Sequence, residues 1–289
     1  MTYHLLTGDN SYSSWSLRGS LLFEQFGIPY KGHFTELYTD AFAETLQAWA
    51  PARTVPAVRT PDGGTWTDSL AIAEGLAEAH PDVAFWPKSP VARAMARSIT
   101  AEMHSGFGAL RGDCPMNLRL QWQGFAPSEA VLADLVRIEA LWAYARDLAE
   151  GEGPWLFGHY SIADAFYAPV AARIAGYALP VSETAWAYVE AHLNDPVFRR
   201  WRAMGEARNR TIAVYDRGLP TGAWPGPEPL KAVIAEGPGE NKACPYSGEP
   251  VTDFLAIDGR RFGFCNPFCR DKTLADPTAW PAFMKLYET

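Results

Sequence analysis

Serine hydroxyls are concentrated near the N-terminus, in the stretch Asn10-Ser-Tyr-Ser-Ser-Trp-Ser-Leu-Arg18. Three of them, Ser11, Ser13 and Ser14, fall between an expected strand and the start of an expected helix. The first turn of a helix has unpaired N–H groups and the positive end of the helix dipole, so it stabilises a thiolate. A serine hydroxyl can donate a further hydrogen bond to that anion, although one serine would also serve simply as the N-cap. We therefore treat the three serines as candidate catalytic residues.

A proline and a polar pair mark two more positions where a ligand can be held. Val55-Pro56 stands at the head of an expected strand, where a cis peptide bond would turn the chain and expose the Val55 backbone to an extended peptide. Asp68 and Ser69 open an expected helix, so the Ser69 hydroxyl and the local N–H groups can hold a carboxylate. A strand-edge proline and an N-cap are the ordinary alternatives for these positions.

Cysteine thiols form a third group close to the C-terminus. Cys265 and Cys269 are four positions apart at an expected turn-to-helix junction, and Cys244 lies earlier in the chain. Three thiolates arranged in this way can hold Zn²⁺, with a fourth ligand from water, Asp253 or Asp258. A segment of this size often needs a metal for stability. The alternative is that Cys265 and Cys269 are packed thiols in a module that binds no metal.

Other polar side chains fall in the middle of the chain. Cys114 follows an expected long helix and is interpreted as a buried thiol that behaves as a small apolar side chain. Glu102 and His104 on that helix are candidates for lining a ligand pocket, with solvated or capping positions as the alternative.

The elements that must position the first two motifs alternate between strand and helix over about the first 80 residues. The hydrophobic pattern predicts a β-α-β-α-β-β-α order and thus one four-stranded mixed sheet covered by helices. The expected strands are Tyr3–Leu6, Tyr30–Leu37, Val55–Val58 and Thr65–Thr67, with a turn at Asp62–Gly64. The expected helices are Ser16–Phe26, Phe42–Trp49 and Ser69–Ala79.

The rest of the chain divides into a helical part and a distinct tail. Long helices without intervening strands are expected over Val91–Leu110, Ser128–Glu150, Ser161–Ala178 and Ser182–Gly205. A Pro/Gly-rich connection follows, with at most one helical turn near Leu230–Ala235. We therefore expect a thioredoxin-like domain over residues 1–82, an all-α domain over 90–217, a linker over 218–242 and a small cysteine-containing module over 243–289.

The composition excludes several classes of protein. Of 289 residues, 48% are hydrophobic and 20% are charged, which is typical of a globular protein and excludes collagen-like, disordered and coiled-coil chains. The net charge of −8, from 25 basic and 33 acidic residues, argues against nucleic acid or an anionic membrane as a partner. Without a signal-peptide pattern or a long apolar run, we expect a cytoplasmic location.

The motifs together resemble the glutathione S-transferase family. The serine turn, Val55-Pro56 and Asp68-Ser69 occur in the order of that family's thioredoxin-fold domain. The stretch Gly153-Pro-Trp-Leu-Phe-Gly-His-Tyr-Ser-Ile-Ala-Asp164 is similar to the folding signature of its all-α domain, in which Ser161 and Asp164 would form a capping box. The resemblance covers about residues 3–210. It implies an α/β thioredoxin-like domain followed by an all-α domain, the glutathione S-transferase fold.

The resemblance also implies a ligand and its contacts. Glutathione would bind as co-substrate, pairing with the Val55 backbone ahead of a cis-Pro56 and placing its γ-glutamyl group on Asp68 and Ser69. Arg53 would hold the glycyl carboxylate. A serine would face the sulfur, as in the serine-type, zeta-like classes.

The choice of serine depends on which feature is aligned. The family's helical arginine, matched to Arg18, favours Ser11. The start of the helix favours Ser13 or Ser14, and these two are our preferred candidates.

The implied activity is activation of the glutathione thiol for attack on a small electrophile, a disulfide or a peroxide. Homodimerisation is a further implication of the resemblance.

The last segment resembles the small treble-clef-like metal-binding modules of the YHS/TRASH type, through Gly263-Phe-Cys-Asn-Pro-Phe-Cys269 and the later Asp276-Pro277. It departs from them at Ser247, where those modules often have cysteine. A metal-binding or sensor protein, or a scaffold without catalysis, on a transferase-derived fold is the alternative to an enzyme.

Overall fold

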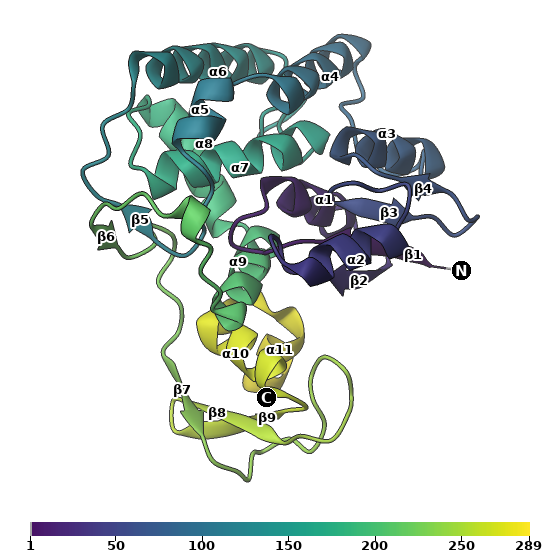
Figure 1. The fold of residues 1–289 in the computed structure, drawn as a ribbon, viewed down its shortest axis with the longest axis vertical. Helices are drawn as coiled ribbons and strands as arrows, with labels where there is room; N and C mark the ends of the chain where they lie inside the picture. Colours follow the sequence, from purple (N-terminus) through teal and green to yellow (C-terminus); the bar gives the residue numbers. More distant parts are fainter. Residues whose placement is uncertain (1) are drawn as a thin grey trace. The chain divides into compact units, whose positions relative to one another are not determined.

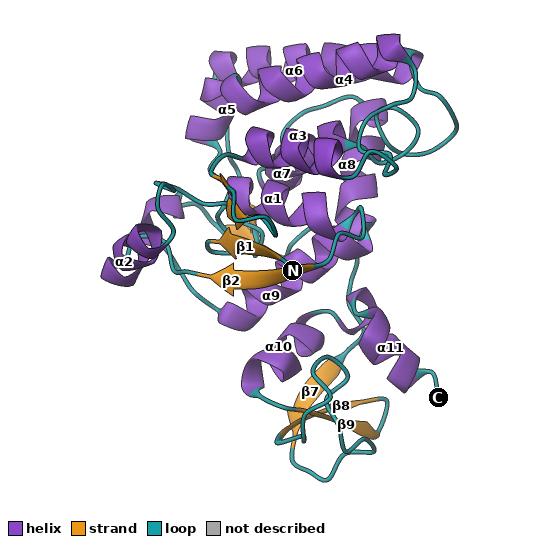
Figure 2. Cartoon of the chain, turned by 90° about the vertical axis from the view of Figure 1, so that its right-hand side faces the viewer, coloured by secondary structure: helices purple, strands orange, loops and turns teal. Residues whose placement is uncertain are grey.

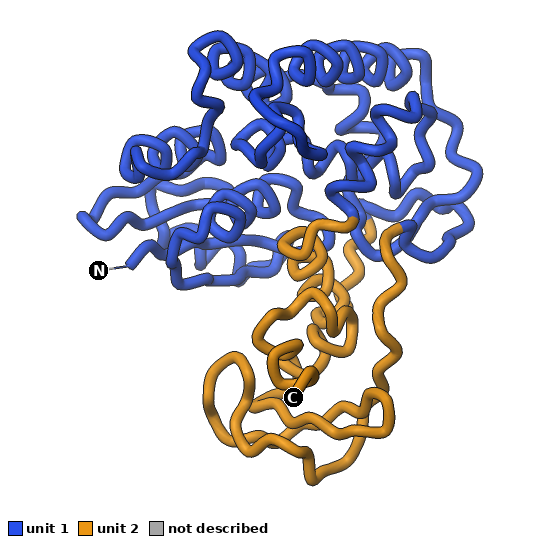
Figure 3. Tube along the Cα trace, turned by 180° about the vertical axis from the view of Figure 1, so that it is seen from behind, with its two compact units in different colours: residues 1–193, 214–225 blue, residues 194–213, 226–289 orange. Residues whose placement is uncertain are grey.

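The computed structural model describes residues 2–289 and divides into two compact units. The first comprises Met1–Leu193 with Val214–Pro225, and the second comprises Asn194–Ala213 with Gly226–Thr289 (Figure 3). No helix within residues 2–289 combines the length and apolar character needed to cross a membrane.

The first unit begins with a four-stranded mixed sheet, as the sequence predicts (Figure 1). Its strands are β1 (Tyr3–Thr7), β2 (Tyr30–Phe34), β3 (Ala57–Arg59) and β4 (Thr65–Trp66), in the order β2-β1-β3-β4. Strand β1 pairs in parallel with β2 and antiparallel with β3, and β3 pairs antiparallel with β4. Helices α1 (Ser14–Glu24), α2 (Asp40–Ala48) and α3 (Ser69–Ala79) connect the strands.

Helix α1 is the most deeply placed element of this domain. Leu17, Leu21, Leu22 and Phe23 have at most 1% of their surface exposed. The helix starts two residues earlier than predicted, because the Ser13 side chain accepts a hydrogen bond from the Ser16 N–H and serves as the N-cap.

The all-α part of the first unit has five helices. They are α4 (Pro90–Ser105), α5 (Gly108–Asp113), α6 (Glu129–Asp147), α7 (Ile162–Gly176) and α8 (Glu183–Asn194). Every residue of α7 is buried, and this helix packs against both α1 and α4. The predicted capping box at its start is confirmed, since the Ser161 N–H donates to Asp164 Oδ2 at 2.8 Å.

Four predictions of secondary structure are wrong. The helix expected over Val91–Leu110 is interrupted at Gly106 and Phe107, and Phe107 has a positive φ of 54°. The helix expected over Ser182–Gly205 is divided by Asp195, which caps the separate helix α9 (Pro196–Arg208).

The other two errors concern strands. Strands β5 (Gln121–Trp122) and β6 (Thr221–Gly222) form a two-stranded sheet where only helices and an extended connection were expected. Instead of a helical turn near Leu230–Ala235, the chain forms strand β7 (Ala232–Ala235), which finds a pairing partner far along the sequence.

The second unit is built around a three-stranded antiparallel sheet (Figure 2). Strand β7 pairs with β8 (Asp253–Ile257), and β8 pairs with β9 (Arg260–Phe264). Helices α9, α10 (Pro267–Ala275) and α11 (Pro281–Tyr287) complete the unit, with short 3₁₀ turns at η1 (Ala213–Tyr215), between the two units in sequence, and η2 (Pro277–Ala279). Its core consists of mainly apolar side chains from these elements: Ala203, Cys244, Leu255, Ile257, Phe262, Phe264, Ala279, Trp280 and Phe283.

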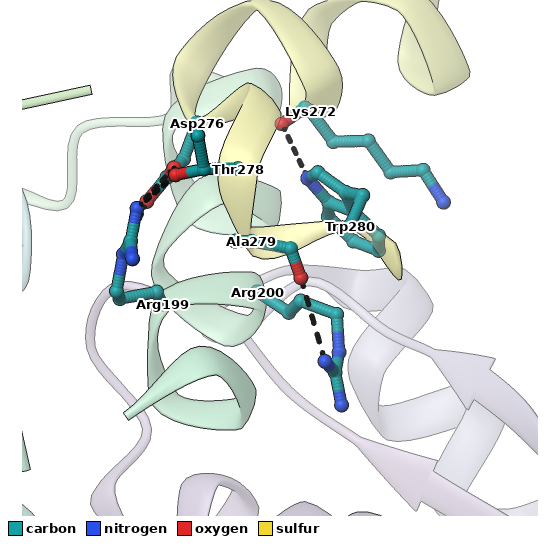
Figure 4. A network of polar contacts seen from close by, with 7 residues as sticks. All are labelled: Arg199, Arg200, Lys272, Asp276, Thr278, Ala279 and Trp280. Carbon is teal, nitrogen blue, oxygen red and sulfur yellow. Dashed lines mark hydrogen bonds and ion pairs between the residues drawn. The ribbon is translucent and has the colours of Figure 1, made fainter. Parts of the chain in front are cut away.

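Polar contacts tie α9 to the segment after α10 (Figure 4). The Arg199 guanidinium donates to both carboxylate oxygens of Asp276, at 2.8 and 2.7 Å. Arg200 donates to the Ala279 carbonyl, and the Trp280 indole donates to the Lys272 carbonyl. Helix α9 therefore packs as part of the C-terminal unit, although it follows the all-α helices in sequence.

Candidate functional site

The serine turn lies between β1 and α1 and is buried. Ser11, Ser13 and Ser14 are between 4% and 8% exposed. The Ser13 hydroxyl donates to Ser16 Oγ at 2.8 Å, and Ser16 Oγ also accepts the Gly8 N–H at 2.9 Å. Ser14 Oγ accepts a hydrogen bond from Arg173 Nη2 at 3.0 Å. The turn thus presents serine hydroxyls at the N-terminus of α1, where an anion is stabilised.

The Val55–Pro56 peptide bond is cis, as predicted, and the two residues lie close to Gly8 and to Gly19 of α1. A Cβ atom on Gly19 would come within 2.8 Å of the Pro56 ring, so α1 and Pro56 approach closely only because residue 19 is glycine. A Cβ atom on Gly8 would come within 3.1 Å of the Val55 side chain. No hydrogen bond of the Val55 backbone is found within residues 2–289.

Asp68 and Ser69 lie at the start of α3, as the sequence predicts. Asp68 is the N-cap, with Oδ1 accepting the Leu70 N–H at 2.7 Å, and its Oδ2 lies 3.4 Å from His104 Nε2. Ser69 is fully buried, and its hydroxyl has no hydrogen-bond partner among residues 2–289. A buried hydroxyl without a partner is uncommon and fits a position that a ligand completes.

A pocket of about 370 Å³ opens beside the serine turn. Its lining comes from the serine turn and the start of α1, from α5 and the segment after it, from α7, and from the segments after β2 and before β6. The residues are Tyr12, Ser13, Ser14, Trp15, Leu37, Tyr38, Arg111, Gly112, Pro115, Met116, Arg173, Val214, Tyr215 and Arg217. Ser11 does not line it, and neither does Arg53, which is exposed. The pocket therefore brings together Ser13 and Ser14 from the set of candidate residues.

Of the other candidates for lining a pocket, Glu102 of α4 is half-buried. Its carboxylate accepts two hydrogen bonds from Arg137, at 2.8 and 3.0 Å. It is not among the residues that line the pocket beside the serines, and neither is His104.

Buried arginines are the feature that the sequence analysis missed. Arg18 and Arg173 are 0% and 4% exposed, and both lie near Arg111. Burial, followed by repulsion from the other arginines, lowers the pKa of Arg18 to about 9. Arg18 stacks on Trp15 and Phe166, and its Nε and Nη1 atoms have no hydrogen-bond partner within residues 2–289. From the sequence, Arg18 stood out only as the match to a helical arginine, and Arg173, within an apolar stretch, gave no signal.

Cys114 fits the interpretation as a packed thiol. Its side chain is fully buried, and burial raises the pKa of the thiol to about 12. It therefore stays protonated near neutral pH and is a poor nucleophile.

The three cysteines of the second unit lie together. The Sγ atoms of Cys244, Cys265 and Cys269 are all within 4.8 Å of one another, and those of Cys265 and Cys269 are 3.8 Å apart. Burial acts to raise the pKa of Cys244, but N–H groups of Tyr246, Ser247 and Cys265 outweigh it and lower the pKa to about 7.

Among residues 2–289, no carboxylate joins the three thiols as a fourth ligand. Asp253 and Asp258, the carboxylates expected as possible fourth ligands, do not join the thiol cluster. Asp253 pairs with Arg270, and Asp258 accepts a hydrogen bond from the Tyr287 hydroxyl. Ser247 Oγ lies 3.3 Å from Cys265 Sγ. A Zn–S bond of about 2.3 Å implies sulfurs roughly 3.8 Å apart in a tetrahedral site, which is the separation of the Cys265 and Cys269 sulfurs.

The match to a known protein family lies in the thioredoxin-like domain. Residues 12–79 match the family described as glutathione S-transferase, N-terminal domain. Over 100 residues the chain is 38% identical to a probable maleylacetoacetate isomerase of Caenorhabditis elegans. That match covers 35% of this chain and 45% of the relative, so the chain aligns with less than half of the curated relative's length.

Structural comparison extends the likeness to the helical part. A glutathione transferase homologue from Burkholderia with bound glutathione aligns with a TM-score of 0.53 and 23% identity, covering 73% of this chain and 100% of that one. A glutathione S-transferase from Rhodospirillum rubrum aligns with a TM-score of 0.51 and 20% identity, covering 73% of this chain and 94% of that one. Glutathione transferase Omega 3C from Trametes versicolor aligns with a TM-score of 0.52 and 19% sequence identity. The alignment covers 70% of this chain and 88% of that one.

Together, these comparisons identify the fold of the chain. The chain has the glutathione transferase fold, a thioredoxin-like domain followed by a helical domain, as predicted. Its residues 12–79 match the N-terminal domain of that family.

Proposed function

We propose that the protein is a glutathione-dependent enzyme of the serine type. The observation that carries the proposal is the buried Ser13–Ser14 pair, which begins α1 and lines a pocket of about 370 Å³. Support also comes from the match of residues 12–79 to the glutathione S-transferase N-terminal domain and from the bound glutathione in the Burkholderia homologue.

The proposed reaction depends on forming the glutathione thiolate. The helix N-terminus and a serine hydroxyl stabilise the anion, so the pKa of the thiol falls and more nucleophile is present at neutral pH. The proton of the S–H bond leaves to solvent, and the sulfur keeps the electron pair. The thiolate then bonds to an electrophilic carbon, whose leaving group departs with the electron pair of the broken bond. With a disulfide, the S–S bond breaks and the second sulfur leaves as a thiolate. With a peroxide, the O–O bond breaks, hydroxide or alkoxide leaves, and glutathione becomes a sulfenic acid.

The rest of glutathione would be held by the two other motifs. The free Val55 backbone would pair with the cysteinyl part, and the Ser69 hydroxyl would donate to the γ-glutamyl carboxylate. Asp68 would receive the γ-glutamyl amine. The exposed Arg53 is proposed to hold the glycyl carboxylate.

Calorimetric titration of glutathione into the full chain tests this function. We expect one site per chain, and we expect Ser69→Ala to weaken binding because the carboxylate loses a donor. Ser98→Ala, on the exposed side of α4, is the matched control. Absence of heat at two temperatures for the unaltered protein would contradict the proposal. Binding would justify a screen of electrophiles, disulfides and peroxides.

We propose a second, separate function for the C-terminal unit, the binding of Zn²⁺ by Cys244, Cys265 and Cys269. It is favoured by the thiol arrangement, in which the three Sγ atoms lie within 4.8 Å of one another. The ion would cross-link the turn at Cys244 to the start of α10 and so stabilise this unit. Metal analysis of the protein purified without chelator should give about one zinc per chain, and Cys265→Ser should abolish it. Zinc-free protein that takes up none on addition of Zn²⁺ would contradict this.

A homodimer in the cytoplasm is the proposed state of the enzyme, on the basis of the likeness to glutathione transferases. Light scattering coupled to gel filtration would measure the mass directly. A mass near 31.8 kDa would correspond to a monomer and contradict the dimer.

A further inference from the structure

The structure distinguishes two serines that the sequence leaves equivalent. Ser13 Oγ accepts the Ser16 N–H at 3.2 Å, and its hydroxyl donates to Ser16 Oγ at 2.8 Å. A serine hydroxyl has one proton to donate. Ser13 therefore uses its proton inside the helix cap and has none left for a ligand.

Ser14 is in the opposite situation. Its Oγ accepts a hydrogen bond from Arg173 Nη2 at 3.0 Å, and no other hydrogen bond of this side chain is found within residues 2–289. An oxygen that accepts from a guanidinium has its own proton free for another acceptor. Because Ser14 lines the pocket beside the start of α1, that acceptor would be a ligand atom in the pocket.

Arg173 is held in place by two further hydrogen bonds. Its Nε donates to the Cys114 carbonyl at 2.8 Å, and its Nη1 donates to the Pro169 carbonyl at 3.0 Å. These bonds fix the guanidinium between α7 and the end of α5, so the direction from which it reaches Ser14 is also fixed. The side chain is 4% exposed and lines the same pocket.

No carboxylate pairs with Arg173 within residues 2–289. The groups that face it are Arg18 of α1, Arg111 of α5, Cys114, Tyr177 after α7 and Tyr215. Burial raises the pKa values of Cys114, Tyr177 and Tyr215, so these three stay neutral near pH 7. Arg173 itself stays protonated, because its pKa, lowered mainly by burial, is about 10. A buried cation without a counter-ion is costly, and an anion bound in the pocket would compensate it.

We propose that Ser14 is the hydroxyl that donates to the glutathione sulfur and that Arg173 is the positioning residue that orients it and supplies positive charge. This inference rests on the proposed function and concerns the same site. Arg173 does not need to touch the sulfur. It occupies the acceptor side of Ser14 Oγ, which directs the proton into the pocket, and its charge strengthens that hydroxyl as a donor.

The test measures the pKa of the glutathione thiol in the complex, from the ultraviolet absorbance of the thiolate as a function of pH. In Ser14→Ala and in Arg173→Met we expect the thiol pKa to rise by about one unit, which is a tenfold lower ratio of thiolate to thiol at a given pH. Arg173→Lys should raise the thiol pKa less than Arg173→Met does, because lysine keeps the positive charge but lacks the planar guanidinium with its fixed N–H donors. Combining Ser14→Ala with Arg173→Met should add little to either change alone, since both remove one interaction.

Two matched controls sharpen this measurement. Arg111→Met removes a cation from the same pocket without removing a contact to Ser14, so its effect on the thiol pKa should be smaller. Ser13→Ala removes the cap of α1 but not the donor, so it should raise the thiol pKa less than Ser14→Ala does. Circular dichroism and the glutathione dissociation constant are measured on every variant, and Ser14→Ala decides the question if Arg173→Met fails to fold.

The outcomes separate the inference from the function on which it rests. A thiol pKa that rises in Ser13→Ala and not in Ser14→Ala would overturn the assignment of the serine. A rise in Ser14→Ala with no change in folded Arg173→Met would overturn the role of Arg173. Absence of glutathione binding by the unaltered protein would instead overturn the proposed function itself.

Discussion

Two buried ionisable side chains in the first unit, Asp164 and His192, compensate in different ways for the loss of hydration. Asp164 is fully buried, and burial raises the pKa of its carboxyl while four hydrogen bonds oppose that effect. The donors are the N–H groups of Leu156 and Ser161 and the hydroxyls of Ser161 and Tyr188. We expect Asp164→Ala to lower the free energy of unfolding by about 3 kcal/mol, because buried donors lose their acceptor. Urea unfolding would measure it, with the exposed Asp147→Ala as the control; equal losses in both would contradict this account.

His192 meets the same cost by staying uncharged. It lies between Trp155 and Tyr188, its Nε2 has no partner within residues 2–289, and burial lowers its pKa to about 3. Between pH 6.5 and 3 the unfolded chain binds a proton that the folded chain does not, so stability falls as the pH falls. This group contributes a slope of up to about 1.4 kcal/mol per pH unit.

The prediction for His192 is tested by unfolding at several pH values. His192→Phe should show a shallower loss of stability between pH 6.5 and 4 than the unaltered protein. The exposed His159→Gln should keep the original slope. Parallel slopes for the unaltered protein and His192→Phe would be inconsistent with a buried neutral imidazole.

Among the elements, α9 shows how a local signal can be overlooked. Asp195 Oδ1 accepts the N–H groups of Val197 and Phe198 at 2.9 and 2.8 Å, and Pro196 takes the first helical position. We expect Asp195→Ala to destabilise the protein by about 1 kcal/mol through loss of the cap, whereas Asp195→Asn should cost much less. Thermal unfolding compares the two. An alanine variant as stable as the asparagine variant would show that the cap is energetically unimportant.

The sequence predicted the elements that local rules determine. Ser69–Ala79 is found with the predicted bounds, because Asp68 caps the helix and its apolar face is regular. The cis-Pro56 and the Ser161–Asp164 capping box were also predictable from short motifs. Strand β7 was missed because Ala232–Ala235 becomes a strand only by pairing with residues 254–257, a distant partner that no local pattern reveals.

In the candidate site, too, local sequence predicted some features, whereas others depend on contacts between distant residues. Positions of the serines and of Asp68-Ser69 followed from their place at helix N-termini. Arg173 was missed, although it donates to Ser14 Oγ, because 159 positions separate the two residues. Only the packing of α7 against α1 brings them together.

At the scale of the whole molecule, the chain forms two units with separate means of stabilisation. The first buries many large apolar side chains, whereas the second encloses a small core and the thiol cluster. A small core supplies limited stability, and a bound metal adds its binding free energy to folding. The two units should therefore respond differently to removal of metal.

Calorimetry with and without a strong chelator would measure this difference. If Zn²⁺ is bound by Cys244, Cys265 and Cys269, chelation should lower the midpoint of one transition and leave the other unchanged. Cys269→Ser should reproduce the low midpoint and make it insensitive to chelator, whereas Cys114→Ser, in the first unit, should keep the response. Fluorescence of the Trp280→Phe variant assigns the sensitive transition, because Trp280 lies in the core of the second unit. Chelation that leaves both transitions unchanged would mean that packing alone holds this unit together, with the thiols as part of its core.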